Sequence, residues 1–583
     1  MCLKQIARLS LPLCLFIVAP TAGAQESVNE VGVSAVRMLQ ANRLAGDIRI
    51  DGRLDEADWE RAQPATGFTE SYPNAGAAAN ERTEARVLWD DQAIYVGVRL
   101  FDSNPDSIAA PLARRDAAGI YSDWLHLIVD SYHDRRTSFR FSVNPRGVQR
   151  DVYMYNDGEE DASWDAVWEV ATQMDSLGWT AEYRIPLSQL RYEGQVEGER
   201  VWGFQIMRDI ARRQQRLSWS PWNRQSPGFV SRFGELRGID GIRPVRRIEV
   251  QPYTSARLTR APSDTLNPFF RSNASRFAGG ADVKVGLTSG LTLTGTINPD
   301  FGQVELDPAV INLSAFESFF SERRPFFVEG ADVFRFGQVR SNINIESQTF
   351  FYSRRIGRSP QRLLQGGQFA YVDAPQETSI LGAAKVTGKV GPWTMGIMSA
   401  LTDQEEARFT TPDGQLSTTL VEPRTNFFLS RLRREFRTGG TVLGSMFSTT
   451  NRRLEDGGPL DGLLRSGALF GGVDFEHLWA ARAWSLSGYA AASHVRGSEA
   501  AMLRTQHSPA RYFQRPDADH VSLDLDRTAM TGHIAEIALR HLGAWDLSLG
   551  YKESSPGFEL NDLGFQGLTD YRQVTAFFGR RVN

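Results

Sequence analysis

The first 240 residues are rich in aromatic side chains and in side chains that form hydrogen bonds. An aromatic face can stack on a ring-shaped ligand, and Arg, Asn, Gln, Asp and Glu side chains can bond to its polar groups. The aromatic candidates are Trp89, Tyr121, Trp124, Trp164, Trp168, Trp179, Trp219 and Trp222. We expect most of them in the core, because a Trp at strand spacing packs a sheet more often than it binds a ligand. The composition permits ligand binding but does not identify the ligand or its site.

Motifs for catalysis and metal binding are sparse. The sequence has no His-Glu-x-x-His, no phosphate loop ending in Gly-Lys-Ser/Thr and no Gly-x-Ser-x-Gly. Acidic residues gather at Asp90-Asp91, at Asp116 with Asp123, and at Glu159-Glu160-Asp161. Two carboxylates about 5–10 Å apart could hydrolyse a glycosidic bond, and their oxygens could hold Ca²⁺. Solvated turn acids are the simpler interpretation, so no cofactor is predicted and Ca²⁺ stays an alternative.

Residues 1–24 have the form of a secretory signal peptide. Lys4 and Arg8 give a basic start, residues 9–18 are mostly apolar, and residues 22–24 form a small-residue cleavage site. We therefore expect an exported mature chain that starts at Gln25. An ordinary buried N-terminal helix is the alternative.

Cysteine content and charge narrow the function classes further. Cys2 and Cys14 are the two cysteines, and both precede the expected cleavage site, so the mature chain has no thiol. With 65 basic and 69 acidic residues, the formal net charge of -4 gives no reason to expect nucleic-acid binding. After residue 24, no apolar run approaches the roughly 18 residues of a membrane-spanning helix. Any membrane residence must therefore use strands.

Short strands separated by turn residues predict an antiparallel β-sandwich over residues 46–240, after a flexible lead-in over 25–45. The expected strands include 86–91, 93–101, 125–130, 138–144 and 201–208. The clearest is in residues 175–192, where apolar and polar residues alternate until Pro186 ends the strand.

Longer alternating strands follow Asp240. In residues 281–298, a three-residue loop that pairs Leu287 with Leu291 puts the apolar side chains on one face. Four further strands have one-sided apolar sets: Trp393, Met395, Ile397 and Leu401; Leu469, Gly471, Val473 and Phe475; Trp484, Leu486, Gly488 and Ala490; Trp545, Leu547, Leu549 and Tyr551. We expect about twelve strands between residues 246 and 582, many near the roughly 9–11 residues of a membrane strand.

These strands predict an outer-membrane antiparallel β-barrel over residues 246–583. Their joints are alternately tight and long, with long loops over 403–423, 452–465 and 497–530, as in outer-membrane barrels. A large soluble sandwich, solenoid or propeller is the alternative. The chain ends in Arg580-Arg581-Val582-Asn583 rather than in an aromatic residue, so we expect a barrel that is incomplete at the C-terminus.

A central helix is expected near residues 307–324. Asp307 is a suitable N-cap and Pro308 a suitable first helical residue, while the apolar residues Leu313, Phe316 and Phe320 share one face. Charged residues surround it: Glu317, Glu322, Arg323, Arg324 and Glu329. Such a helix cannot lie in lipid, so it is either a plug in the barrel or a periplasmic helix that packs the two domains together.

The pattern over residues 175–192 resembles the last part of a family 9 carbohydrate-binding-module-like domain. The resemblance extends to residues 121–130, to Phe139-Arg140 with Val143-Asn144, and to residues 217–220 with 232–234. It implies a β-sandwich fold and a glycan ligand. Because such modules commonly accompany hydrolases, it also implies a possible role in glycan breakdown.

The resemblance fails at the family's two stacking positions. Ile120 and Pro227 stand where the family has its clamp Trp residues, and His126 stands where it has an acid. Arg140 and Asn144 are the polar contacts that carry over. Tyr121, Trp124 and Trp222 are the nearest aromatic substitutes, and these five residues form the predicted carbohydrate site.

Residues 298–330 resemble the signature of an uncharacterised bacterial outer-membrane domain that follows family 9-like modules, and this resemblance covers about 246–583. Together the two resemblances imply a carbohydrate-binding outer-membrane protein with a periplasmic N-terminal domain, serving glycan binding or uptake. Its partners would be a glycan and outer-membrane lipid, with no nucleic acid. One alternative is a glycoside hydrolase, or its accessory, in carbohydrate catabolism, with no catalytic residue assigned. Another is a structural envelope protein that binds peptidoglycan or a periplasmic partner.

Overall fold

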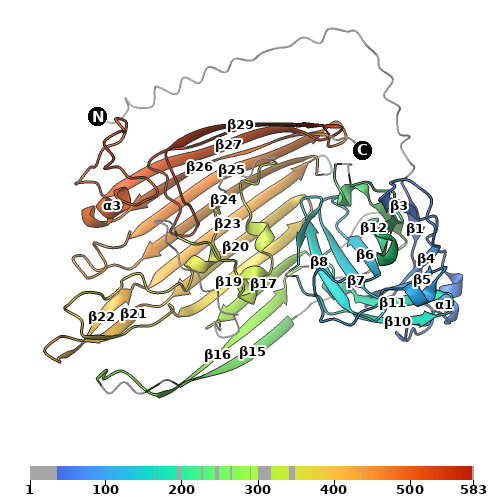
Figure 1. Ribbon diagram of the computed structural model, residues 1–583, viewed down its shortest axis with the longest axis horizontal. Coiled ribbons are helices and arrows are strands. Elements are labelled where there is room, and N and C mark those ends of the chain that lie inside the picture. The colour runs from blue at the N-terminus through green and yellow to red at the C-terminus, as the bar shows by residue number, and fades with distance from the viewer. Residues whose placement is uncertain are drawn as a thin grey trace, which may run out of the picture. The chain divides into compact units, whose positions relative to one another are not determined.

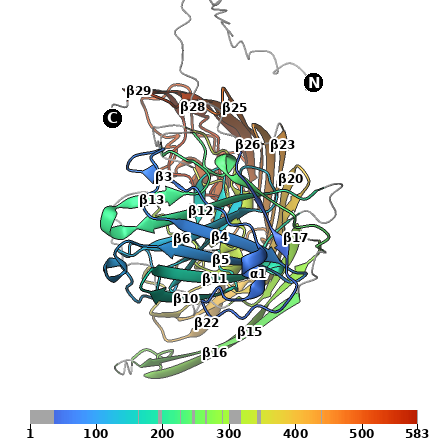
Figure 2. The same ribbon diagram turned by 90° about the vertical axis from the view of Figure 1, so that its right-hand side faces the viewer.

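A computed structural model shows an all-β protein (Figures 1 and 2). It describes residues 36–580 except 163, 193–198, 225–226, 243–247, 261, 263–265, 289, 300–316, 341–347 and 437–438. The expected signal peptide lies outside the described residues. Among the described residues, no helix is both long enough and apolar enough to cross a bilayer.

Two β-sheets form the N-terminal sandwich (Figure 2). The nine-stranded sheet consists of β1 (Met38–Gln40), β14 (Gly234–Arg237), β12 (Trp202–Ile210), β6 (Trp124–Asp130), β7 (Ser138–Val143), β8 (Gln149–Tyr155) and β9 (Glu159–Asp161). In addition, β13 (Gln215–Ser218) pairs with β12, and β3 (Thr69–Tyr72) pairs with β13. The five-stranded sheet consists of β10 (Glu169–Asp175), β11 (Gly178–Pro186), β5 (Ala93–Phe101), β4 (Thr83–Trp89) and β2 (Asn42–Arg43).

The core of the sandwich lies between these sheets and is formed by alternate residues of their strands. Leu125, Leu127 and Val129 of β6 are buried there, together with Trp179 and Tyr183 of β11. The strand expected within residues 175–192 is therefore confirmed as β11, and a 3₁₀ turn (Leu187–Gln189) follows Pro186.

The expectation of a flexible lead-in over residues 25–45 is wrong from Met38 onward. Here β1 pairs in parallel with β14, and β2 pairs in parallel with β4. Leu39 is buried in the core. Strands this short are stabilised by the sheets that receive them, so their own sequence carries too little alternation to reveal them.

Twelve strands form one antiparallel sheet in the C-terminal part, the number expected from the sequence (Figure 1). They are β15 (Ile248–Arg260), β16 (Asn273–Gly286), β17 (Leu291–Ile297), β19 (Ile380–Val390), β20 (Trp393–Thr402), β23 (Thr425–Phe436), β24 (Thr441–Arg452), β25 (Gly467–Trp479), β26 (Trp484–Arg496), β27 (Ala529–His541), β28 (Trp545–Ser554) and β29 (Tyr571–Arg580). The predicted pairing of Leu287 with Leu291 is confirmed by the hydrogen bond from the Leu287 amide to the Leu291 carbonyl. Between its described strands the sheet is open, with β15 and β29 at the edges.

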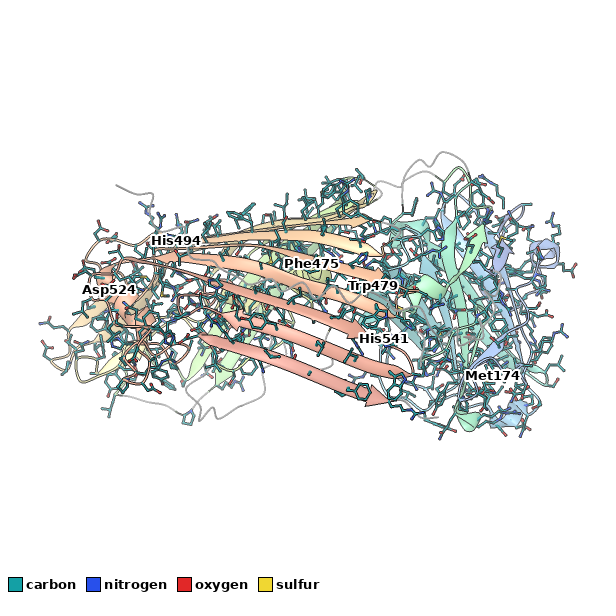
Figure 3. All side chains as sticks on the ribbon, turned by 90° about the horizontal axis from the view of Figure 1, so that it is seen from above. Met174, Phe475, Trp479, His494, Asp524 and His541 are labelled. Carbon is teal, nitrogen blue, oxygen red and sulfur yellow. The ribbon has the colours of Figure 1, made fainter. Side chains whose placement is uncertain are left out.

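The two faces of this sheet differ in polarity. In β25, Leu469 and Val473 are exposed while Phe470 between them is buried. In β28, Leu549 and Tyr551 are exposed, whereas Ser548 and Lys552 are buried on the inner face. The apolar faces expected from the sequence therefore point outward. In Figure 3, His494 marks one end of the long strands, and Trp479 and His541 mark the other.

A non-sheet segment, residues 317–340 and 348–356, lies against the inner face of the sheet. It contains α2 (Pro325–Val328) and two 3₁₀ turns (Ala331–Phe334 and Ser353–Arg355). Phe336 packs on Phe470 and Tyr489, with ring centroids 5.8 and 5.9 Å away. Of the helix expected near 307–324, residues 307–316 lie outside the described part and residues 317–324 are not helical. The short helix begins at Pro325 instead, because proline fits the first turn of a helix. Before it, Phe319 packs on Tyr352 and Phe565, and the backbone of Phe320 is hydrogen-bonded to the Tyr352 hydroxyl.

Ion pairs join the sandwich to the tight turns of the twelve-stranded sheet. Lys389 Nζ lies 2.7 Å from Asp134 Oδ2, and Arg136 Nη2 lies 2.7 Å from Glu476 Oε2. The three strands β18 (Tyr371–Asp373), β21 (Glu405–Thr410) and β22 (Leu416–Glu422) form a separate small sheet, and α3 (Glu499–Gln506) lies in the loop between β26 and β27.

Candidate functional site

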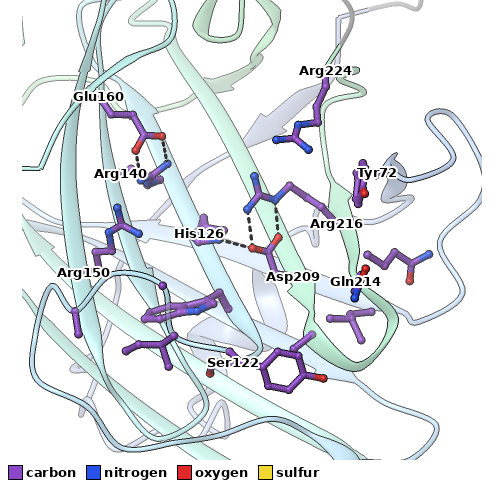
Figure 4. Close-up of a pocket in the computed structure, with 18 of the residues that line it drawn as sticks. Tyr72, Ser122, His126, Arg140, Arg150, Glu160, Asp209, Gln214, Arg216 and Arg224 are labelled. Carbon is purple, nitrogen blue, oxygen red and sulfur yellow. Dashed lines mark hydrogen bonds and ion pairs between the residues drawn. The ribbon is translucent and has the colours of Figure 1, made fainter. Parts of the chain in front are cut away.

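A pocket of about 520 Å³ opens on the outer face of the nine-stranded sheet (Figure 4). Its floor is made by neighbouring strands in the order β13, β12, β6, β7, β8 and β9. The alternation of side chains along β6 explains which of its residues line the pocket. Leu125 and Leu127 point into the core, so Trp124 and His126 point outward into the pocket.

The strand register sets the polar residues of the floor in adjacent rows. Asp209 on β12 pairs with Arg216 on β13 and with Trp124 on β6. Ser142 on β7 lies between its partners His126 on β6 and Arg150 on β8. Residues distant in the sequence are thus neighbours, as directly opposed residues of antiparallel strands must be.

Two bidentate ion pairs hold the carboxylates of the pocket. Arg140 donates to both oxygens of Glu160 over 2.7 and 2.9 Å. Arg216 donates to both oxygens of Asp209 over 2.5 and 2.6 Å. Such paired N–H···O bonds fix the planes of both groups.

His126 links the second of these pairs to β7. Its Nε2 lies 3.2 Å from Asp209 Oδ2, and its Nδ1 lies 2.8 Å from Ser142 Oγ. Burial lowers the pKa of His126 although Asp209 acts to raise it. The neutral ring then donates from Nε2 to Asp209 and accepts at Nδ1 from the Ser142 hydroxyl.

Both pocket carboxylates are ionised at neutral pH. Burial works to raise the pKa of Asp209, but hydrogen bonds from Arg216 and the neighbouring His126 hold it below its usual range. Burial likewise opposes ionisation of Glu160, and Arg140 overcomes it, so the pKa of Glu160 is also lowered. The general acid of a glycosidase needs a raised pKa. Neither of these two carboxyls meets that requirement.

Two further guanidinium groups face the pocket and form no ion pair with a carboxylate among the described residues, although the charge of Arg150 helps to lower the pKa of Glu160. Arg150 extends from β8, and Arg224 extends from the loop after β13 on the opposite side of the floor (Figure 4). The Arg224 guanidinium lies over the ring of Tyr72, 5.3 Å from its centroid. Their charges are therefore available to a ligand.

Aromatic rings form part of the floor and rim. Trp124 is half-buried and stacks on His126, with ring centroids 6.3 Å apart and planes 13° apart. Tyr121 at the rim is 66% exposed. Trp222 is also half-buried, its Nε1 donating to the Gly228 carbonyl over 3.2 Å.

The structure brings four of the five predicted site residues together. Tyr121, Trp124, Arg140 and Trp222 line the pocket. Asn144 does not, since it is fully buried and its side chain donates to the Pro111 carbonyl and accepts from the amide of Val148. The structure therefore does not place Asn144 with the other four residues, because its side chain closes the adjacent tight turn.

The sequence did not predict most of the charged residues that form the floor of the pocket. The residues not predicted are Tyr72, Arg150, Glu160, Asp209, Arg216 and Arg224. Alternation within β8 and β12 assigns Arg150 and Asp209 to an outward face, but pairing across strands decides which outward residues meet. Of the family's clamp positions, Ile120 lines the pocket.

An acidic cluster outside the pocket is already paired with an arginine side chain. Asp116, Asp151 and Asp165 have carboxylate oxygens within 4.8 Å of one another. Arg115 Nη2 lies 2.7 Å from Asp151 and 3.1 Å from Asp165. The guanidinium offsets one of the three negative charges and already occupies oxygens of Asp151 and Asp165, which are then less available to Ca²⁺.

Comparisons with known proteins divide the chain where the structure does. Residues 50–237 match the model of the carbohydrate family 9 binding domain-like family, and residues 244–458 match a domain of unknown function, DUF5916. No curated protein matches the chain significantly.

Solved structures resemble each part only distantly. A family 9 carbohydrate-binding module from Caldicellulosiruptor kristjanssonii in complex with cellotriose is 18% identical and covers 36% of this chain and 99% of its own, with a TM-score of 0.24. The outer-membrane channel DcaP of Acinetobacter baumannii is 7% identical and covers 83% of this chain and 94% of its own, with a TM-score of 0.22. Scores this low carry no argument about function.

Proposed function

We propose that this chain, a family 9 carbohydrate-binding-like domain followed by a DUF5916 domain, is an outer-membrane protein whose sandwich binds a glycan in the pocket on its nine-stranded sheet. The observation that carries the proposal is the composition of that pocket. It combines exposed aromatic rings with fixed hydrogen-bonding groups, in the domain that matches the carbohydrate-binding family. A glycan site needs both.

In this proposal Tyr121 and Trp124 supply the stacking faces. Tyr121 is at the rim and exposed, and Trp124 is half-buried with its ring parallel to that of His126. Arg140 and Arg216 are already oriented by their carboxylate partners, so little side-chain entropy is lost when they bond to a ligand.

The proposed membrane location rests on the outer face of the twelve-stranded sheet. Apolar side chains are exposed along it, including Ile397, Leu469 and Leu549. Near the tight turns, Trp479 stacks on Trp484 with ring centroids 6.0 Å apart. Apolar bands flanked by aromatic residues are typical of lipid-facing barrel surfaces.

Glycan binding can be tested with the full-length chain in detergent micelles on a glycan array that includes peptidoglycan fragments. We expect wild-type binding to be lost or weakened about tenfold in Tyr121→Ala and in Trp124→Ala, since stacked aromatic contacts of this size contribute about 1 kcal/mol or more. Met174→Ala is the matched control, because Met174 is exposed on β10 of the other sheet. Failure of the wild-type chain to bind any glycan would refute the proposed function. Binding to peptidoglycan fragments alone would favour an envelope-anchoring role.

A further inference from the structure

The pocket carries a surplus of positive charge. Four arginines line it: Arg140, Arg150, Arg216 and Arg224. Its charged carboxylates are Glu160 and Asp209, and His126 is neutral because burial lowers its pKa. Two carboxylates balance two guanidinium groups, which leaves a net charge of about +2.

The hydrogen-bonding inventory shows the same imbalance. A neutral sugar hydroxyl both donates and accepts, so neutral-sugar sites mix acceptors with donors. Here each carboxylate oxygen of Glu160 and Asp209 already accepts an N–H from Arg140 or Arg216, which leaves fewer lone pairs for a ligand. Guanidinium groups donate and do not accept. With four of them in the lining, the pocket offers more donors than acceptors, and its complement is a ligand rich in acceptors.

We propose that the ligand is an anionic glycan, whose carboxylate or sulfate-ester groups are bound by Arg150 and Arg224. This inference rests on the proposed function and specifies its ligand class. The two guanidinium groups stand on opposite sides of His126, which lies on the pocket floor (Figure 4). A sugar ring stacked on that floor would thus present acidic substituents to a guanidinium group at either side. Planar guanidinium groups bind carboxylates and sulfate-like oxyanions through paired N–H···O bonds.

The first test compares matched oligosaccharides with the full-length chain in detergent micelles. Isothermal titration calorimetry would use cellotetraose, its C6-carboxylated counterpart and its 6-O-sulfated counterpart, which share one backbone and linkage. We expect one or both charged forms to bind at least about tenfold more tightly than cellotetraose. That preference should shrink at high salt, because the groups are partly exposed to solvent.

The second test uses Arg150→Gln, Arg224→Gln and the double variant. Each single substitution should weaken binding of the charged tetrasaccharide about tenfold. Binding of cellotetraose should weaken by much less, so that the preference for the charged form narrows. Arg53→Gln is the matched control, since Arg53 is exposed in the same domain outside the pocket. Neither arginine has a carboxylate partner among the described residues, so folding should be preserved.

The outcomes separate this inference from the proposed function. Equal, salt-insensitive binding of neutral and charged tetrasaccharides would overturn the anionic ligand while glycan binding stands. The absence of binding to all three would overturn the proposed function. If free sulfate bound as tightly as the sulfated tetrasaccharide, the site would be a simple anion site, and the inference would also fail.

Discussion

At the scale of single residues, Glu182 shows how a strand's polar position can be used inside the protein. It belongs to β11, where the alternation predicts a solvent-facing residue, but the chain around residues 51–59 covers it completely. Its Oε2 accepts from the amides of Asp51 and Gly52 over 3.0 and 3.1 Å, and its Oε1 accepts from Trp59 Nε1 over 3.2 Å. Burial still dominates and raises the pKa of Glu182 to about 7.

This raised pKa makes the stability of the sandwich depend on pH. Between pH 4.5, the ordinary value, and about 7, the folded chain keeps a proton that the unfolded chain releases. Stability should therefore fall as pH rises through this window, by about 3 kcal/mol, and level off above it. We expect Glu182→Gln to lose this slope, as measured by hydrogen exchange of the β5 and β11 amides at pH 5 and pH 8. Glu169→Gln, on the exposed surface of β10, should keep the wild-type slope; identical pH profiles for wild type and Glu182→Gln would contradict the assignment.

The sequence predicted the aromatic part of the candidate site better than its charged part. Tyr121, Trp124 and Arg140 follow from a single strand pattern and a family resemblance. Arg150 and Arg224 could not be predicted as site residues, because their presence in one pocket depends on the order of strands in the sheet and on the path of the loop after β13. The local sequence around each residue specifies neither the strand order nor the loop path.

At the scale of elements, β25 allows a direct test of which surface meets lipid. Val473 is 60% exposed on the outer face, near the middle of the strand. Val473→Arg should destabilise the membrane-inserted protein by about 2–4 kcal/mol if this face lies in the hydrocarbon layer. The measurement is guanidinium unfolding from lipid vesicles.

The control for this prediction is Leu416→Arg. Leu416 is 66% exposed on β22, outside the twelve-stranded sheet, so a charge there should change stability by less than about 0.5 kcal/mol. Equal effects of the two substitutions would mean that the outer face of β25 does not contact lipid.

Long strands were predictable and short elements were not, for a physical reason. Each strand of the twelve-stranded sheet repeats its period over many residues, and the hairpin at Leu287 and Leu291 admits one register. By contrast, β1 and β2 are too short to show a period, and α2 begins only at Pro325, after residues that contact aromatic side chains from distant parts of the chain. The sequence pattern around Phe320 satisfies a helix equally well, so tertiary contacts decide.

At the scale of the whole molecule, the segment on the inner face of the sheet contacts both parts of the chain. Arg335 lies over the ring of Tyr155, and Arg340 donates to the Asn156 carbonyl, so the segment fits the domain-joining role as well as the plug. Phe336 and Phe350 pack against each other and against Phe470 and Tyr489, which point inward from β25 and β26. The cavity that remains beside this segment has a volume of about 940 Å³ and charged residues such as Arg431, Asp474 and Glu476 in its lining. We therefore propose that the segment restricts passage along the inner face.

Loosening the segment tests this idea. The double variant Phe336→Ala/Phe350→Ala should raise conductance in planar bilayers, because it removes the contacts that hold the segment on the sheet. Phe369→Ala/Phe409→Ala removes a comparable ring pair, 5.0 Å between centroids, in a region outside the twelve-stranded sheet. That variant should conduct like the wild type, and an unchanged conductance in both variants would exclude control by this segment.

The strand order of the large sheet also has a kinetic consequence. Most pairings join strands that are neighbours along the chain, over connections that range from tight turns to the loop between Arg496 and Ala529. The pairing of β17 with β19 is different, because residues 298–379 intervene and include the segment that packs on the inner face. Closing that long loop carries the greatest entropic cost in the sheet. Pairing of β17 with β19 is thus coupled to the docking of this segment on the inner face of the sheet. When the two strands pair during folding, the segment must be brought to the sheet in the same step.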